Sequence, residues 1–357
     1  MKKLRVGVIY GGRSGEHEVS VASAASIFRH LDATKYEPVP IRIEKTGRWT
    51  LGDKVPQALS AAAVLEQRSS EALQIVEPSA AVAVTGVDVV FPVLHGPYGE
   101  DGTVQGLLEL ANVPYVGAGV LGSAAGMDKA VMKTLFAASG LPIVAHLVAL
   151  RPEWERGAGD VTRRVAATLG FPVFVKPANL GSSVGISKAR NESEFVEAME
   201  LALQFDRKIV IEAGVADARE IECAVLGNDE PKASTVGEII PSREFYDYEA
   251  KYLDEGSELL IPAPLSANHT AQIQRFAVEA FRAVEGAGMA RVDFLMSRTT
   301  EQIYVNEVNT IPGFTTISMY PKLWEASGLP YSALIDRLIE LALERHAEKQ
   351  RLRTSIN

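Results

Sequence analysis

The chain has 357 residues, with 36 Lys and Arg against 45 Asp and Glu, so its formal net charge is −9. That length predicts two or three domains. Apolar residues make up 47% and charged residues 23%, beside 29 Gly and 18 Pro, which is typical of globular proteins and excludes disorder, collagen and coiled coil. The acidic balance, without a block of Lys and Arg, argues against nucleic acid as the main partner but leaves room for a local basic pocket.

The cysteine count and the N-terminus favour a cytoplasmic protein. Cys223, the only cysteine, has no partner for an internal disulfide and does not suggest a thiolate metal site. The first residues, MKKLRVGVIYGG, hold a short apolar run that glycines end, which indicates a first strand and not a signal peptide. No run approaches the roughly 18 apolar residues that a membrane helix needs, so we expect no membrane partner.

The first third of the chain alternates predicted strands with predicted helices. Residues 5–10 are β-branched and apolar, two glycines end the run, and residues 19–31 carry apolar side chains at helical spacing. The same signals predict strands over 37–43, 87–93 and 114–116 and a helix over 103–111. This alternation favours a parallel sheet flanked by helices. Residues 53–83 are rich in alanine and stay unassigned.

A second unit begins near Met127. Its patterns predict helices over 129–139, 192–203 and 267–285, strands over 171–176, 209–212, 220–226, 290–296 and 302–307, and a terminal helix from residue 331. After the strand 220–226 we expect an irregular stretch, rich in tyrosine and charge, to about residue 256. The polar end, 344–357, is expected to be a solvated or frayed tail.

One glycine motif has two interpretations. Residues 117–122, GAGVLG, fit the GxGxxG pattern of dinucleotide-binding turns. That motif should follow the first strand of its unit and precede an acidic residue about 20 positions later, and neither condition holds here. We therefore favour a structural turn between domains over a nicotinamide site. The sequence also lacks the GxxxxGK[ST] loop, so any ATP must be held in another way.

A second glycine-containing loop is a better candidate for phosphate. Residues 179–185, NLGSSVG, follow directly after a predicted strand that ends near Lys176. Glycines leave backbone N–H groups open to an anion, and the hydroxyls of Ser182 and Ser183 add further donors. We favour a phosphate cradle over a plain hairpin connection, which would need fewer residues and no lysine at the strand end.

Three oxygen-bearing side chains suggest a metal site. Asp293, Glu307 and Asn309 lie on or just after two adjacent apolar strands, with no His or Cys nearby. Oxygen ligands of this kind suit Mg²⁺ that bridges nucleotide phosphates. Acidic residues on strands are more often merely solvated. The Pro312-Gly313 turn favours the metal interpretation, because glycine permits close backbone approach to a reacting oxygen.

Two loops of the first unit predict a substrate pocket. His95 begins the segment HGPYGEDG at the end of a predicted strand, and Glu16 lies in the loop after the first strand. Ligands of open α/β sheets bind outside the carboxyl ends of the strands. His95 alone would be assigned a structural role, but together with Glu16 it indicates a pocket in which Glu16 could pair with an ammonium group.

These motifs and their neighbours occur in the order of a known family. The segments are GGRSGEHEVS (11–20), HGPYGEDGT (95–103), MDK (127–129), VKPANLGSSVGISK (175–188), REIECAVLG (219–227), YDYEAKY (246–252), ARVDF (290–294) and NEVNTIPGFTTIS (306–318). Together they resemble the D-alanine:D-alanine ligases of the ATP-grasp superfamily, from the first strand to about residue 340. Residues 53–83 and the polar tail match weakly.

The resemblance implies an α/β fold, in which an N-terminal parallel-sheet (Rossmann-like) domain precedes a two-part ATP-grasp fold. It implies three domains: residues 1–124 for the first D-alanine, and residues 125–215 and 216–357 clamping ATP, the last with a lid loop and the metal site. It also implies the reaction. ATP phosphorylates one D-alanine carboxylate, the amine of a second D-alanine attacks the acyl phosphate, and phosphate leaves. D-Alanyl-D-alanine is a precursor of bacterial peptidoglycan.

The resemblance assigns residues to the nucleotide and to the metal. Lys129 and Lys176 would contact the nucleotide phosphates beside Ser182 and Ser183. Glu212 would face the adenine and Glu220 the ribose. Two Mg²⁺ ions, for which Mn²⁺ could substitute, would be held by Asp293, Glu307 and Asn309.

It assigns others to the amino acids. Arg291 and the Gly313 N–H would stabilise the acyl phosphate and the oxyanion. Glu16, beside His95, would pair with the first ammonium and would be linked by hydrogen bonds to Ser182 and Tyr252. Ser318 would bind the second carboxylate.

Residues 238–256 exceed the usual length of a loop, and we favour a lid over a linker. A closed lid would bring Lys251 and Tyr252 to the site and exclude water, which would hydrolyse an acyl phosphate. The resemblance also suggests a homodimer. The nearest rival is another ATP-grasp ligase, such as a D-alanine:D-lactate ligase, which Tyr252 argues against. A nicotinamide oxidoreductase and an inactive nucleotide-binding regulator are the other rivals, the regulator disfavoured because no expected catalytic position is lost.

Overall fold

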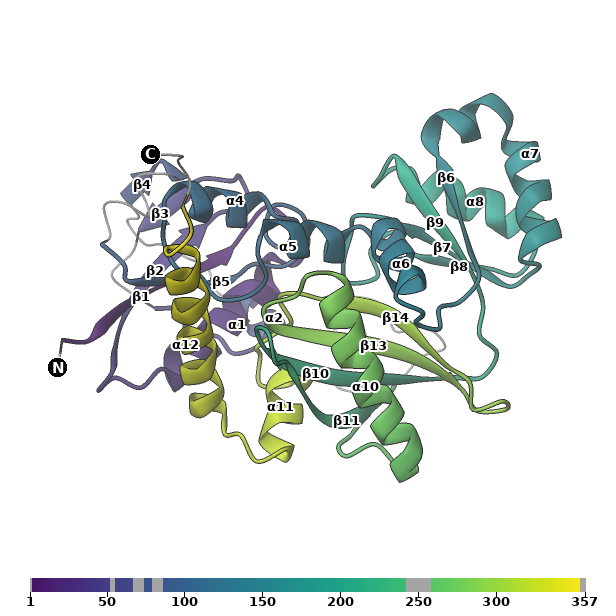
Figure 1. Ribbon diagram of the computed structural model, residues 1–357. Coiled ribbons are helices and arrows are strands. Elements are labelled where there is room, and N and C mark those ends of the chain that lie inside the picture. The colour runs from purple at the N-terminus through teal and green to yellow at the C-terminus, as the bar shows by residue number, and fades with distance from the viewer. Residues whose placement is uncertain (1, 52–54, 67–73, 79–85, 242–257, 354–357) are drawn as a thin grey trace.

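The computed structural model describes residues 2–51, 55–66, 74–78, 86–241 and 258–353. Within these ranges the strands form three sheets, each with helices packed against it (Figure 1). The expected α/β class with a parallel sheet in the N-terminal part is confirmed, and the two sheets that follow are antiparallel. Lys251 and Tyr252 lie outside the described residues.

The first sheet has the strand order β4-β3-β2-β1-β5. Its centre is parallel, because β1 (Leu4–Gly11) pairs in parallel with both β2 (Tyr36–Ile43) and β5 (Val89–Val93). Two short antiparallel strands, β3 (Trp49–Leu51) and β4 (Gln74–Val76), extend one edge. The predicted strand at 114–116 is reduced to one bridge between Tyr115 and Val90. The described residues of this part of the chain include the helices α1 (His17–His30), α2 (Ala61–Glu66) and α4 (Thr103–Leu110).

The second sheet is antiparallel, with the order β6-β9-β7-β8. Its strands are β6 (His146–Leu150), β7 (Val173–Pro177), β8 (Ser187–Ala189) and β9 (Lys208–Ala213). Two helices, α7 (Arg151–Thr168) and α8 (Glu192–Ala202), cover one face with buried side chains that include Trp154 and Phe195. The segment 178–186 therefore joins two antiparallel strands, as a hairpin connection would.

The third sheet is antiparallel, with the order β12-β11-β10-β13-β14. Its strands are β10 (Ala218–Gly227), β11 (Lys232–Ile240), β12 (Glu258–Leu260), β13 (Gly288–Ser297) and β14 (Ile303–Asn309). One face packs on α10 (Ala267–Ala283) and on α6 (Lys129–Ala138), around a core that includes Met132, Phe136 and Phe281. The opposite face is therefore left for other contacts.

The C-terminal helices join the first sheet to the third. α11 (Met319–Ala326) contacts β10 and β11, whereas α12 (Tyr331–Lys349) contacts α1, β5, β10 and β13 (Figure 1). One apolar core runs through this junction, from Phe91 of the first sheet through Phe314 and Leu338 to Met289 of the third. The two sheets are thus packed as one body.

Two expectations need correction. The stretch after residue 226 was expected to be irregular, but β11 is a strand that pairs with β10. Polar residues interrupt the apolar pattern of β11. Glu238, for example, lies on this strand and is buried in an ion pair with Arg219. The polar tail was expected from residue 344, but α12 continues to Lys349, and Arg345 donates hydrogen bonds to the backbone oxygens of Gly117 and Tyr115.

The GAGVLG segment forms a packed turn at the start of α5 (Val120–Met127). A Cβ atom on Gly122 would lie 2.3 Å from the backbone oxygen of Glu285, which follows α10. The glycine is therefore required for close packing between these two elements. Among the described helices none is both long and apolar enough to cross a membrane.

Candidate active site

A cavity of about 490 Å³ lies where the three sheets meet. Loops of the first sheet, strands of the second sheet and the open face of the third all line it. Every site residue predicted from the sequence within the described ranges is among its lining: Glu16, His95, Lys129, Lys176, Ser182, Ser183, Glu212, Glu220, Arg291, Asp293, Glu307, Asn309, Gly313 and Ser318. Residues 117–122 are not.

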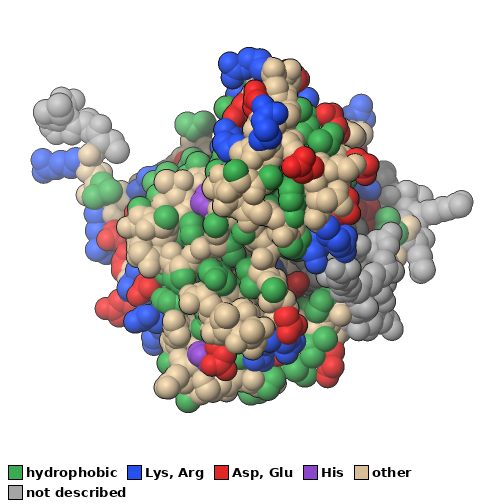
Figure 2. All heavy atoms as spheres, turned by 90° about the vertical axis from the view of Figure 1, so that its right-hand side faces the viewer, with side chains coloured by type: hydrophobic (Ala, Val, Ile, Leu, Met, Phe, Trp, Pro, Cys, Tyr) green, Lys and Arg blue, Asp and Glu red, His purple; other side chains and the backbone are tan. Residues whose placement is uncertain are grey.

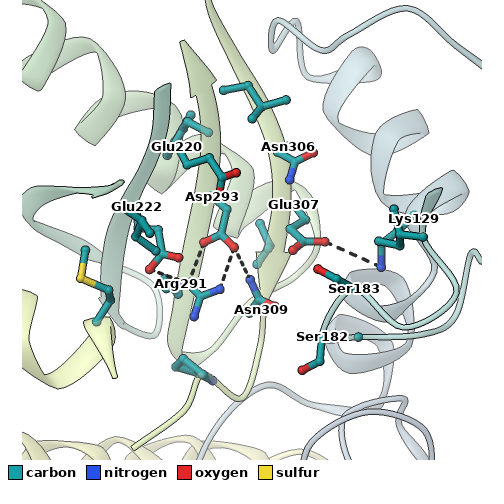
Figure 3. Close-up of a pocket in the computed structure, with 18 of the residues that line it drawn as sticks. Lys129, Ser182, Ser183, Glu220, Glu222, Arg291, Asp293, Asn306, Glu307 and Asn309 are labelled. Carbon is teal, nitrogen blue, oxygen red and sulfur yellow. Dashed lines mark hydrogen bonds and ion pairs between the residues drawn. The ribbon is translucent and has the colours of Figure 1, made fainter. Parts of the chain in front are cut away.

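The register of the third sheet gathers acidic side chains on the face toward the cavity. Asp293 lies between two cross-strand neighbours, Glu222 on β10 and Glu307 on β14, and Arg291 is opposite Asn309. Cross-strand neighbours share a face, and so do residues two apart on one strand. Figure 3 shows these side chains directed into one space, opposite Lys129, Ser182 and Ser183.

Asp293 and Arg291 form the tightest contact on this face. The Arg291 Nε and Nη2 atoms each donate to one oxygen of Asp293, both at 2.7 Å. The Asn309 side-chain amide donates to Asp293 at 3.0 Å, and Glu222 lies 3.0 Å from Arg291. A paired fork of this kind is the strong form of a charged hydrogen bond. The carboxylates on the face outnumber its arginine, so the face favours further cations.

A β-bulge turns one more polar side chain toward the cavity. Asp293 pairs with Glu307 but Phe294 pairs with Val305, so Asn306 is an extra residue in β14. The bulge keeps Ile303, Val305 and Val308 in the core although their spacing departs from strict alternation. Asn306 lines the cavity and accepts a hydrogen bond from Lys176 at 3.4 Å.

Two lysines face the acidic side chains from across the cavity. Lys129 begins α6, whose N-terminus is capped by Asp128 through bonds to two backbone N–H groups. The Lys129 Nζ atom donates to the Leu180 backbone oxygen at 2.7 Å and lies 3.7 Å from Glu307. Lys176, at the end of β7, lies 2.7 Å from Glu212. The cavity thus has a basic wall and an acidic wall.

Glu16 and His95 come together because their strands do. β1 and β5 are parallel neighbours, so the loops that follow them lie at the same edge of the sheet. Glu16 is buried and accepts a hydrogen bond from Ser182, which links the first sheet to the loop after β7. A Cβ atom on Gly181 would lie 2.8 Å from a Glu16 oxygen, so a larger residue there would displace the Glu16 carboxylate.

His95 is poised as a buried acceptor. Its Nδ1 atom lies 3.0 Å from the Ile311 backbone oxygen, which makes Nδ1 the protonated nitrogen. Its buried Nε2 atom has no hydrogen-bond partner among the described residues. Burial, with help from nearby Arg291, holds the pKa of His95 below its ordinary value although Glu16 opposes this. The ring is therefore neutral at pH 7.

Glu100 carries a perturbed carboxyl group in the same corner. It accepts a hydrogen bond from the Gly96 N–H at 2.8 Å. Burial and the charge of Glu16 raise the pKa of Glu100 to about 8, so it holds a proton at neutral pH. Nearby, Ser318 accepts a hydrogen bond from the Thr315 N–H at 2.9 Å, beside Gly313.

Sequence reasoning missed several residues of the site. Glu222 lies two positions after Glu220 on the same strand. Because side chains alternate between the two faces of a strand, the sequence could have placed Glu222 on the same face as Glu220. Asn306 is hidden by the bulge. Lys133 has one signal, its place one helical turn after Lys129. It is fully buried and lies 2.9 Å from Glu212.

Comparisons with known proteins cover nearly the whole chain. Residues 5–118 match the family described as D-ala D-ala ligase N-terminus, and residues 135–340 the family described as D-ala D-ala ligase C-terminus. The D-alanine–D-alanine ligase of Heliobacterium modesticaldum is 52% identical, over 98% of either chain. That of Solibacter usitatus is 54% identical, also over 98% of each.

Solved structures agree in fold. The D-alanine–D-alanine ligase from Coxiella burnetii has a TM-score of 0.82 at 40% identity, and the match covers 98% of this chain and 97% of that one. The VanG D-Ala:D-Ser ligase from Enterococcus faecalis has a TM-score of 0.83 at 36% identity, with 96% and 100% of the two chains covered.

Proposed function

The chain belongs to the D-alanine–D-alanine ligase family, and from that premise we propose that it joins two D-alanine molecules into D-alanyl-D-alanine. ATP would be consumed, ADP and phosphate would be released, and the product would serve peptidoglycan synthesis in the cytoplasm. One observation supports the proposal most: the described residues assigned to ATP, metal and substrate all line one cavity at the junction of three sheets. On the face in Figure 2, Lys and Arg side chains are interspersed with Asp and Glu, which argues against a nucleic-acid surface there.

The basic wall would hold the nucleotide. Lys129 and Lys176 would contact its phosphates, and the loop that carries Ser182 and Ser183 would offer backbone N–H groups and hydroxyls to the same oxygens. Glu212 would lie toward the adenine and Glu220 toward the ribose. A carboxylate is a poor electrophile, so phosphorylation of the first D-alanine precedes attack by the second amine.

The acidic wall suits Mg²⁺. Asp293, Glu307 and Asn309 present only oxygen ligands of the hard-cation type, on a face where carboxylates outnumber the arginine. No cluster of three or more His, Cys, Asp and Glu is arranged as a metal site within the described ranges, and this set has two carboxylates and an amide. Two bound ions would offset charge on the transferring phosphoryl group, and Mn²⁺ could replace them. Arg291 forms a bidentate ion pair with Asp293, so its guanidinium would lie close to the transferring phosphoryl group and could offset the same negative charge.

The part of the cavity beside the loops that follow β1 and β5 would bind the amino acids. Glu16 would pair with the ammonium of the first D-alanine, and the Nε2 atom of neutral His95 would accept a further hydrogen bond. Arg291 and the Gly313 N–H would stabilise the acyl phosphate and the oxyanion of the tetrahedral intermediate. Ser318 would hold the second carboxylate. Lys251 and Tyr252, to which we assign roles on a lid, lie outside the described residues.

The domain limits 1–124, 125–215 and 216–357, and a homodimeric assembly, are parts of the same proposal. The similarity to a D-Ala:D-Ser ligase makes the second substrate the point to test. Purified protein with ATP and Mg²⁺ should form D-alanyl-D-alanine from D-alanine and nothing from L-alanine. In mixtures with D-serine or D-lactate, D-alanyl-D-alanine should dominate at neutral pH in mass spectra of the products. A dominant mixed product would move the chain to the rival ligase class, and product from L-alanine would refute the pocket assignment.

A further inference from the structure

A buried carboxylate lies between two lysines behind the basic wall. Glu212, on β9, is 2% exposed. Its Oε2 atom is 2.7 Å from the Lys176 Nζ, and its Oε1 atom is 2.9 Å from the Lys133 Nζ. Glu212 and Lys176 line the cavity, whereas Lys133, which α6 places on their far side, is fully buried and does not. The ion pair of Lys133 with the cavity lining is therefore made through Glu212.

The charges of this cluster do not balance. Burial alone would raise the pKa of Glu212, but the two lysines outweigh it and lower the pKa to about 2, so the group is a carboxylate at neutral pH. Two lysines then face one buried carboxylate; burial lowers the pKa of Lys133, and its ion pair with Glu212 opposes this. Half-buried His146 adds no charge, because burial and Lys133 hold its pKa below the ordinary value. At Glu212 itself there are two lysines for one carboxylate, and Glu307 is a more distant negative charge for both.

Of the two lysines, Lys176 is the one that can leave Glu212 for a ligand in the cavity. Its ammonium also reaches Asn306 on the opposite sheet, at 3.4 Å, so it already lies between the basic and acidic walls. If Lys176 moved to a nucleotide phosphate with no second lysine present, Glu212 would remain buried and unpaired. Removing one partner of a buried ion pair is strongly unfavourable.

We propose that Lys133 is a positioning residue that neutralises Glu212, so that Lys176 can exchange this carboxylate for the phosphates of the bound nucleotide. The inference rests on the proposed function, since it takes ATP as the ligand. It gives Lys133 no contact with the nucleotide. Although Glu212 is assigned to the adenine, a ligand without phosphates leaves Lys176 paired with it, so the loss of Lys133 should weaken binding of the phosphates far more than binding of the base.

The test compares two ligands in Lys133→Met. Calorimetry should show that this variant binds ADP with Mg²⁺ about tenfold or more weakly than wild type, a typical coupling within one charge network. Adenosine, which lacks phosphates, should compete with an affinity within about twofold of wild type. Equal losses for both ligands would mean that Lys133 shapes the base site or the fold, and would overturn the proposal. So would unchanged ADP binding.

A matched control separates the charge from general damage. Lys208, also on β9, pairs with Asp128, the capping residue of α6, and does not line the cavity. Lys208→Met should keep ADP affinity within about twofold, because Glu212 is untouched. A loss equal to that of Lys133→Met would show that any disturbance of α6 weakens binding, and would contradict the assigned role.

A double variant tests the route through Glu212. In a Glu212→Gln background no buried carboxylate needs a counter-charge, so adding Lys133→Met should change ADP affinity by less than about twofold. An undiminished tenfold loss in that background would overturn the proposal. The wild-type protein distinguishes failure of the proposed function from failure of the role assigned to Lys133. If wild type binds no ADP and makes no dipeptide, the proposed function fails. Normal wild-type binding with an unaffected Lys133→Met refutes this inference alone.

Discussion

Glu307 connects the two walls of the cavity. Its carboxylate lies across from Asp293 on the neighbouring strand and 3.7 Å from Lys129. Glu307→Gln preserves size and hydrogen bonding but removes a charge that two cations would share. We expect kcat to fall by at least about 100-fold, as it does when one group that stabilises transition-state charge is lost.

The fold should survive this change. The thermal midpoint of Glu307→Gln should stay close to that of Glu348→Gln, a control at an exposed position of α12. A Glu307→Gln enzyme with near-wild-type kcat at ordinary Mg²⁺ concentrations would show that the metal assignment is wrong.

Glu100 makes the free energy of unfolding depend on pH. Its pKa is raised to about 8 in the folded protein, mainly by burial and by Glu16, from an ordinary value of 4.5. Between these values the unfolded chain releases a proton that the folded protein keeps, so stability from this group is full below 4.5 and is lost as the pH rises toward 8.

Glu100→Gln cannot ionise and should therefore lose less stability than wild type between pH 5 and pH 8. Urea denaturation at both pH values measures this difference. If wild type and Glu100→Gln lose the same amount, the folded protein does not hold a proton at Glu100.

Strand β14 shows which features of an element the sequence predicts and which it does not. The apolar run predicts the strand, and Glu307 with Asn309 predicts its polar face. The bulge at Asn306 was not foreseen, because it depends on pairing with β13 that no local pattern encodes. β11 was missed for a related reason: buried Glu238 has its partner, Arg219, on another strand. Local patterns thus find apolar elements and motif residues, while paired buried charges need the tertiary structure.

The end of α12 carries a prediction of its own. Arg345 donates to two backbone oxygens of the segment before α5 and stacks on the Tyr115 ring, with 4.5 Å between the guanidinium carbon and the ring centroid. Arg345→Ala would leave those oxygens without their donor and remove the packing of its long side chain. We expect the free energy of unfolding to fall by about 2 kcal/mol.

Urea denaturation checks this, with Arg351→Ala as the control. Arg351 is exposed just beyond the helix, so its loss should change stability by less than about 0.5 kcal/mol. Equal effects of the two changes would mean that the end of α12 is a frayed tail, as the sequence predicted.

The cavity depends on all three sheets, so a nucleotide bound there should stabilise the entire fold. A ligand at 100 times its Kd contributes about 2.7 kcal/mol. ADP with Mg²⁺ should therefore raise the thermal midpoint, whereas NAD⁺ should not, because residues 117–122 form a packed turn away from the cavity. A matching shift with NAD⁺ would revive the dinucleotide interpretation.

The acyl phosphate is the central intermediate of the proposed reaction, because the groups assigned to the cavity serve either its formation or its capture. D-Alanine labelled with ¹⁸O in both carboxylate oxygens gives the most direct test. Phosphorylation of that carboxylate followed by attack of the second amine leaves one labelled oxygen in the peptide carbonyl and passes the other to phosphate. Mass spectrometry should therefore find one ¹⁸O in each phosphate released, with one phosphate formed per dipeptide. Dipeptide formed together with unlabelled phosphate would contradict the account.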